Sequence, residues 1–136
     1  MSRIHDYPDT QAKLRGAALA VTDTCGARWS YATFKDASQA AADQLTQTGV
    51  AAGDRVLIVA ENCAAALAFV FGCSRIGAWA VPVNARQTAA EIDRILDHAR
   101  PAAVILTTLA SANAAEHATR LGAHDISGAF GQVALA

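Results

Sequence analysis

The chain has 136 residues, which is enough for one domain with its own core and too few for two sizeable domains. Its 11 basic and 12 acidic residues leave a formal net charge of -1, and no cluster of Lys and Arg breaks this balance locally. This composition excludes the electrostatic footprint of a nucleic-acid-binding protein, and we expect a single domain over residues 1–136.

The N-terminus and the cysteines indicate the compartment. Residues 1–10, MSRIHDYPDT, lack the apolar segment of a secretory signal peptide. Cys25, Cys63 and Cys73 form neither a CxxC pair nor a zinc-ligand spacing, and their odd number suits a reducing environment better than a disulfide framework. We therefore expect a cytoplasmic protein.

A β-hairpin and a helix are the first predicted elements. Residues 17–23 are rich in small apolar residues and Val, a Cys-Gly turn follows, and residues 27–30 form the second strand. Ser30 then caps a helix over about 31–48, and Gly49 lies just past its end, where a left-handed backbone suits Gly. Its apolar stripe at helical spacing comprises Phe34, Ala37, Ala41 and Leu45.

The next segment predicts a buried strand followed by a buried helix. Residues 56–60 are a continuous apolar run, which is typical of a strand covered on both faces in a parallel sheet. In residues 63–76 only Ser74 and Arg75 are clearly polar, so we expect this helix to be covered on more than one side. The whole run 63–83 could cross a bilayer by length, but Gly, Pro and Arg interrupt it, and we expect no transmembrane segment.

Alternation of strands and helices continues to residue 107. Residues 79–83 read as a second buried strand, a Thr88 to Glu91 capping box opens a helix that reaches Ala99, and residues 103–107 form a third strand. A weaker Ala-rich helix over 111–121 comes next, and no pattern is readable in residues 123–136. The fold class is therefore α/β, with a parallel-sheet βαβαβ unit over 54–107 and a preceding β-hairpin and helix.

Two strand ends carry residues that could bind a ligand. Glu61 and Asn62 follow the first buried strand, and ligands of open α/β sheets bind at such ends. Because no GxGxxG or GxxxxGK[ST] motif follows, we interpret Asn62 as the N-cap of the next helix and this corner as scaffold. Asn84 could touch a substrate, but a Pro-x-Asn turn, in which Asn bonds its own backbone, is the favoured interpretation.

The remaining polar residues do not converge on a site. His98 lies on the solvent face of its helix, and the histidines at 5, 117 and 124 have no partner at metal-ligand spacing. Cys63 and Cys73 are ten residues apart on a buried helix, where Cys acts as a small hydrophobe. Arg55, Arg75 and Arg86 are expected to be separate exposed charges. We assign no catalytic, cofactor-binding or metal-binding residue.

Three stretches resemble the N-terminal region of the AMP-forming acyl-CoA synthetases, within the adenylate-forming ligases. They are ARWSYATF (27–34), GVAAGDRVLIVAEN (49–62) and GCSRIGAWAVPVNARQTAAEIDRILDHARPAAVI (72–105), and the likeness covers residues 17–107. The resemblance implies that this chain is the N-terminal part of the ligase large domain, beside the acyl pocket. The complete enzyme would use ATP, Mg²⁺ and CoA to convert a carboxylic acid into its acyl-CoA, AMP and pyrophosphate.

The family's phosphate-binding and catalytic motifs are missing from this sequence. The only lysines are Lys13 and Lys35, and the Gly-rich piece at 127–132 has no Lys or Pro. We therefore expect the chain alone to be inactive and to hold no cofactor, and to pair with the remainder of the ligase or another chain through exposed apolar surface. Two alternatives stay open: a non-catalytic scaffold or interaction module, and an independent Rossmann-like nucleotide-binding domain.

Overall fold

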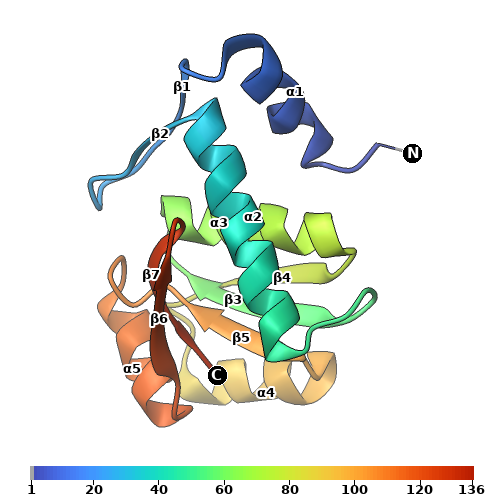
Figure 1. The fold of residues 1–136 in the computed structure, drawn as a ribbon. Coiled ribbons are helices and arrows are strands. Elements are labelled where there is room, and N and C mark those ends of the chain that lie inside the picture. The colour runs from blue at the N-terminus through green and yellow to red at the C-terminus, as the bar shows by residue number, and fades with distance from the viewer. Residues whose placement is uncertain (1) are drawn as a thin grey trace.

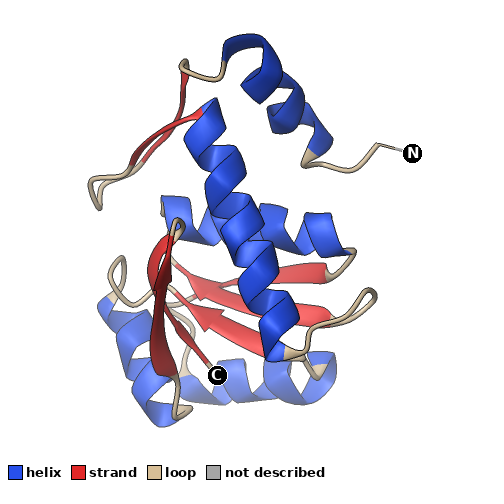
Figure 2. Ribbon diagram, viewed as in Figure 1, coloured by secondary structure: helices blue, strands red, loops and turns tan. Residues whose placement is uncertain are grey.

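A five-stranded sheet lies between two pairs of helices in the computed structural model, which describes residues 2–136 (Figures 1 and 2). The strands run in the order β4-β3-β5-β7-β6. Helices α2 and α3 cover one face, and α4 and α5 cover the other (Figure 1). Their bounds are α2 Tyr31–Thr48, α3 Ala64–Ile76, α4 Ala89–Ala99, α5 Ala112–Arg120, β3 Arg55–Ala60, β4 Trp79–Asn84, β5 Ala103–Leu106, β6 His124–Gly128 and β7 Gly131–Leu135.

The predicted parallel unit is confirmed. Strand β3 pairs in parallel with β4 on one side and with β5 on the other. Its residues alternate between the two layers, so that Val56 and Ile58 pack under α2 and α3, whereas Leu57 and Val59 pack over α4 and α5. Strand β3 is therefore the strand buried on both faces that its apolar run predicted.

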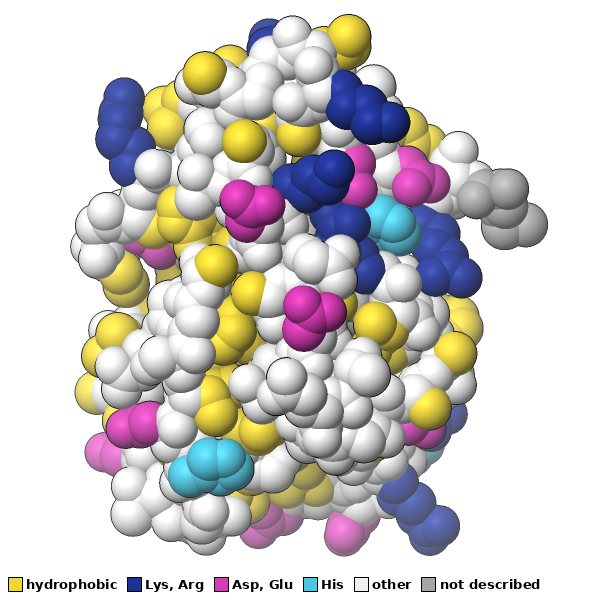
Figure 3. Space-filling view, viewed as in Figure 1, with side chains coloured by type: hydrophobic (Ala, Val, Ile, Leu, Met, Phe, Trp, Pro, Cys, Tyr) yellow, Lys and Arg dark blue, Asp and Glu magenta, His cyan; other side chains and the backbone are white. Residues whose placement is uncertain are grey.

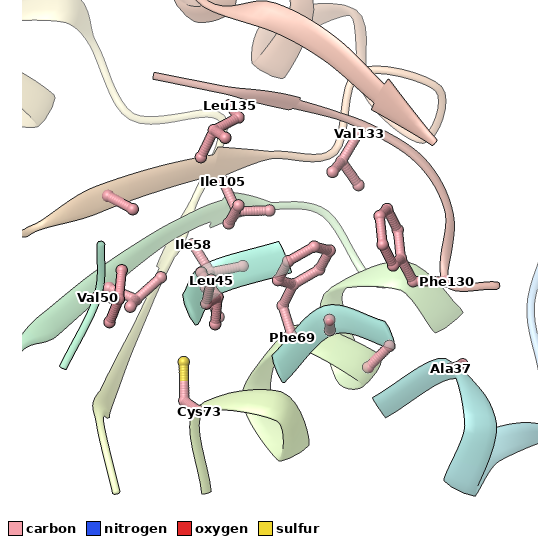
Figure 4. Close-up of a cluster of buried hydrophobic side chains, with 14 residues drawn as sticks. Ala37, Leu45, Val50, Ile58, Phe69, Cys73, Ile105, Phe130, Val133 and Leu135 are labelled. Carbon is pink, nitrogen blue, oxygen red and sulfur yellow. The ribbon is translucent and has the colours of Figure 1, made fainter. Parts of the chain in front are cut away.

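The sheet continues beyond the predicted unit. Residues 124–135, which carried no readable pattern, form a β-hairpin whose strand β7 pairs antiparallel with β5. The sheet is consequently mixed rather than wholly parallel. Phe130, in the turn of this hairpin, packs its ring edge to face on Phe69 of α3, with centroids 4.8 Å apart (Figure 4). The hairpin thereby completes the core beneath α2 and α3.

Strand β4 lies at the edge of the sheet, and its prediction as a buried strand is wrong. Trp79 is 68% exposed, and Pro82 and Asn84 are exposed as well. Pro82 was the local signal for this position, because proline cannot donate to a ladder and is confined to strand edges and starts. Its neighbour along the sheet is β3 alone.

Helix α2 has the predicted bounds and caps. The hydroxyl of Ser30 accepts a hydrogen bond from the backbone N–H of Thr33 at 3.1 Å, and Gly49 has φ 100°. The helix crosses α3 at close range, because a Cβ placed on Gly72 would lie only 2.9 Å from the Cβ of Ala41. This close approach allows the two helices to share one core layer.

The N-terminal part of the chain packs at one end of this assembly. Helix α1, Asp6–Arg15, was not predicted, and the hairpin of β1, Leu19–Thr22, and β2, Arg28–Ser30, has the predicted antiparallel pairing. Both lie beyond the end of the sheet, above α3 in Figure 1. None of the helices in residues 2–136 combines the length and apolarity needed to cross a membrane.

Candidate functional site

A cleft of about 910 Å³ opens at the carboxyl ends of β3 and β4. The ends of β3 and β4 form two of its walls, the β1–β2 hairpin forms another, and the first turns of α3 close its side. Apolar residues such as Ile58, Leu67 and Val70 form much of its lining. Its polar residues include Asp23, Glu61, Asn62, Asn84 and Arg86. The structure therefore gathers Glu61, Asn62 and Asn84, the strand-end residues singled out in the sequence, around one cavity.

Glu61 is held as an ion-pair partner. Its Oε1 accepts a hydrogen bond from Nε of Arg86 at 2.7 Å, and its backbone N–H donates to the hydroxyl of Thr107 at 3.3 Å. A hydrogen bond from the Ser111 hydroxyl, and then the bond from Arg86, lower the pKa of Glu61. A general base works best with a pKa near the working pH, so these partners make Glu61 a poor one.

The N-terminus of α3 is capped by a distant residue, and the prediction that Asn62 caps it is wrong. The N-cap position belongs to Cys63, whose side chain makes no capping bond, and Asn62 is exposed. Instead Oδ2 of Asp23 accepts the backbone N–H of Ala64 at 2.7 Å. The β1–β2 hairpin thus supplies the carboxylate that accepts this N–H, a role that the side chain of the N-cap residue usually has.

The second oxygen of Asp23 organises the hairpin turn. Oδ1 accepts the backbone N–H groups of Cys25 and Ala27, each at 2.9 Å. The bond from Ala64 is the largest influence on the pKa of Asp23 and lowers it. Burial opposes this effect, and the two turn bonds lower the pKa further. Asp23 is therefore a structural anion that ties the hairpin to α3.

Asn84 makes the local bond that its turn predicted. Its Oδ1 accepts the backbone N–H of Arg86 at 2.9 Å, so the side chain supports the turn that follows β4. That turn directs Arg86 back to Glu61 at the end of β3. The two strand ends are thereby linked across the mouth of the cleft.

Two further polar side chains make contacts that the sequence did not predict. His117 is 7% exposed, and its Nε2 lies 3.1 Å from the carbonyl oxygen of Ala85 and 3.0 Å from that of Gln87. Arg75, expected as an exposed charge, donates to both carboxylate oxygens of Asp9 and to the Ser38 hydroxyl. His117 fixes α5 on the turn after β4, and Arg75 fixes α1 on α3.

The cysteines and histidines form no metal centre in residues 2–136, where no group of three or more His, Cys, Asp or Glu side chains could hold an ion. Cys73 belongs to the core, and burial raises its pKa to about 11 (Figure 4). Cys63, by contrast, is the N-cap residue of α3 and is half-buried, so it lies at the end of the helix rather than within it.

Comparison with known proteins gives one consistent family. The family model described as AMP-binding enzyme matches residues 8–131. The long-chain fatty-acid–CoA ligase FadD13 of Mycobacterium tuberculosis is 36% identical over 78 residues, which are 57% of this chain and 16% of that protein. Acyl-CoA ligase sidI of Aspergillus fumigatus is 37% identical over 73 residues, or 54% of this chain and 12% of the ligase. The chain therefore spans a small part of each relative's length.

Solved structures agree with the sequence matches. The N-terminal domain of FACL13 from Mycobacterium tuberculosis superposes with a TM-score of 0.69 at 31% identity, covering 73% of this chain and 25% of that one. VinN in complex with L-aspartate gives a TM-score of 0.70 at 27% identity, covering 74% of this chain and 28% of VinN. Both confirm the α/β architecture with its mixed sheet.

Proposed function

Because the chain belongs to the AMP-binding enzyme family, we propose that it is the N-terminal segment of an acyl-CoA ligase. The complete enzyme joins a carboxylic acid to AMP from Mg-ATP, releases pyrophosphate, and transfers the acyl group to the thiol of CoA. The observation that carries this proposal is the family match over residues 8–131, supported by relatives named as acyl-CoA ligases.

In this enzyme the cleft would serve as a wall of the large domain rather than as its reactive centre. Much of its lining is apolar, which suits contact with further chain or with an acyl group. Its charged side chains already have partners within the segment: Arg86 bonds Glu61, and Asp23 bonds the backbone. These bonds make the two carboxylates poor candidates for a general base.

We expect the segment alone to bind Mg-ATP weakly, if measurably, and to form no acyl adenylate. The helix start facing the cleft could attract a phosphate through its free N–H groups, but Asp23 occupies the first of them with a negative charge. Glu61 adds a second negative charge, and Arg86, which lines the same cleft, is paired with it. Adenylation needs cations or donors that converge on phosphate oxygens, and the rim supplies an excess of carboxylate.

The main alternative is a non-catalytic scaffold that pairs with another chain. The exposed edge strand β4 is the observation that favours it, since an unpaired edge can accept a further strand. An independent Rossmann-like nucleotide-binding domain is less well supported, because the turn after β3 carries no Gly-rich phosphate loop and the helix start is capped by Asp23. In either ligase or scaffold role, we propose a cytoplasmic setting that keeps the three thiols free.

The decisive experiment begins with the encoding DNA. We expect the reading frame to continue past codon 136 into a Gly/Ser/Thr-rich loop ending in Pro-Lys, and the extended polypeptide to form acyl-CoA from one of a panel of fatty and aromatic acids. The 136-residue chain serves as the control, assayed by calorimetric titration with Mg-ATP and by pyrophosphate exchange. A stop codon there with a separate partner chain would support the scaffold, and micromolar ATP binding by the control would favour the nucleotide-binding domain.

A further inference from the structure

Two cysteines that are far apart in the sequence line the same small cavity. Cys25 lies in the turn of the β1–β2 hairpin, and Cys63 is the N-cap residue of α3. Both border a pocket of about 80 Å³, together with residues that include Thr107 and Gln132. The two cysteines therefore border one shared space, although 38 positions separate them in the sequence.

The carboxylate of Asp23 holds the backbones of these two segments together. One of its oxygens accepts the N–H of Cys25 at 2.9 Å, and the other accepts the N–H of Ala64, the residue after Cys63, at 2.7 Å. A single side chain therefore fixes the hairpin turn and the helix start side by side. A disulfide needs this kind of backbone proximity, because its Cα atoms lie within about 7 Å.

The two thiols also differ in access. Cys25 is exposed, so a small oxidant reaches it first, whereas Cys63 is half-buried behind it. Burial is the main influence that raises the pKa of Cys63, and the negative charge of a Cys25 thiolate raises it further. Cys73 is buried in the core among α2, α3 and the sheet, away from this cavity.

We propose that Cys25 and Cys63 are the site of a reversible intramolecular disulfide formed under peroxide. The Cys25 thiol loses its proton, and the thiolate attacks hydrogen peroxide, so that an S–O bond forms as the O–O bond breaks. The departing hydroxide takes up the proton that the thiol lost, and the products are a sulfenic acid and water. The Cys63 sulfur then attacks the sulfenic sulfur, so that the S–S bond forms, the S–O bond breaks, and a second water leaves. Two thiols are oxidised and one peroxide is reduced to two waters.

This bond would lock the hairpin onto α3 at the edge of the larger cleft, because Asp23, Cys63 and the hairpin also border that cleft. Oxidation would add a covalent link between the hairpin and α3, which otherwise are joined by the hydrogen bonds of Asp23. The inference does not depend on the proposed ligase function, since it concerns only two thiols and the backbone between them.

The test is a thiol map of the purified chain after graded treatment with hydrogen peroxide, with remaining thiols alkylated under denaturing conditions. We expect the three free thiols to fall to one, Cys73, with a peptide linking Cys25 to Cys63 in the mass spectrum and all three thiols restored by dithiothreitol. The bonded species should remain monomeric on a non-reducing gel.

Matched variants separate this pairing from general oxidation. Cys73→Ala should form the same bond and lose both of its thiols, whereas Cys63→Ser should stop at a Cys25 sulfenic acid that dimedone traps. Oxidation in urea should scramble the pairing to include Cys73, because the folded geometry is then absent. Intermolecular Cys25 dimers alone, or peroxide-treated native chain that retains the Cys63 thiol, would overturn the proposal, and neither result bears on the ligase assignment.

Discussion

At the scale of single residues, Asp23 carries more of the structure than any pattern around it suggests. Its carboxylate accepts three backbone N–H groups, two in its own turn and one at the start of α3. Charge-assisted bonds of this kind are stronger than neutral ones, and the favourable helix dipole adds to the bond with Ala64. The hairpin and α3 therefore share one stabilising anion.

Replacing Asp23 by Ala should lower the free energy of unfolding at neutral pH by about 1–2 kcal/mol, the cost of losing a good helix cap. Because the folded-state pKa of Asp23 is lowered, its contribution is complete above the unfolded pKa of about 3.9 and is lost as the pH falls through the folded value. Urea unfolding of wild type and variant, measured from pH 7 down to acid pH, should show the difference between their free energies of unfolding becoming smaller. Asp36→Ala, an exposed change on α2, is the control. A difference that stays constant into acid would rule out this account.

At the scale of elements, α1 is docked by polar contacts rather than by a core. None of its residues is buried. Arg75 of α3 reaches Asp9 of α1 with bonds of 3.0 and 2.5 Å, and His5 lies 2.8 Å from the Ser74 hydroxyl. Figure 3 shows basic and acidic side chains gathered together over this end of the molecule. The position of helix α1 therefore depends on its polar contacts with Arg75 and Ser74.

Asp9→Ala should loosen α1 while leaving the sheet intact, because it leaves Arg75 without its carboxylate partner. We expect the amides of α1 to exchange with solvent about tenfold faster, which corresponds to ~1.4 kcal/mol. Hydrogen exchange followed by mass spectrometry makes this measurement, with peptides from β3 as an internal reference. Lys13→Ala, on the exposed surface of the same helix, is the matched control. Equal acceleration in β3 would mean that α1 unfolds only with the whole domain.

The crossing of α2 and α3 offers a second prediction at this scale. Gly72→Ala should destabilise the fold by about 1–3 kcal/mol, because the new Cβ would meet the Cβ of Ala41 at 2.9 Å and the backbone N of Ala42 at 3.0 Å. In an exposed helix the same change would stabilise by roughly 1 kcal/mol, so the sign is diagnostic. Chemical denaturation gives the value, and Gln47→Ala on the exposed side of α2 controls for helix propensity. A more stable variant would refute the close packing.

At the scale of the whole molecule, the exposed apolar surface is not on helix α3, where the sequence placed it. Helix α3, whose apolar composition suggested an open face, has no exposed residue. Exposed apolar side chains include Trp79 at the β4 edge, which is 68% exposed, and Tyr7 and Leu14 on α1. An unpaired edge strand with an exposed Trp is a template for pairing with another chain.

We therefore expect the isolated chain to self-associate through β4, and Trp79→Lys to reduce that association by placing a charge on the edge. Sedimentation velocity over a range of concentrations tests this, with Leu14→Lys, a similarly exposed apolar residue on α1, as the control. A wild-type chain that stays monomeric at high concentration would contradict the prediction, as would equal effects of the two variants.

Most of the elements could be predicted from the sequence because their signals are local. Ser30 and Gly49 mark the two ends of α2, and the apolar run in β3 together with the capping Thr88 predicts the parallel unit. Helix α1 escaped prediction because it has no apolar stripe, and β6 and β7 escaped because their hairpin has only a weak alternation. In the candidate site, Glu61 and Asn84 were identified and the local bond of Asn84 was predicted, but the ion pair of Glu61 with Arg86 was not.

Periodicity, caps and motifs act over a few neighbouring residues, so the secondary structure of the central unit and the family resemblance follow from the sequence alone. The edge position of β4, the cleft between the strand ends, and the shared cavity of Cys25 and Cys63 depend on how distant segments pack together. The bond from Ala64 to Asp23 joins residues 41 positions apart. Such a contact forms because the sheet and α3 bring the hairpin to the helix start, and no local pattern specifies which distant carboxylate will arrive there.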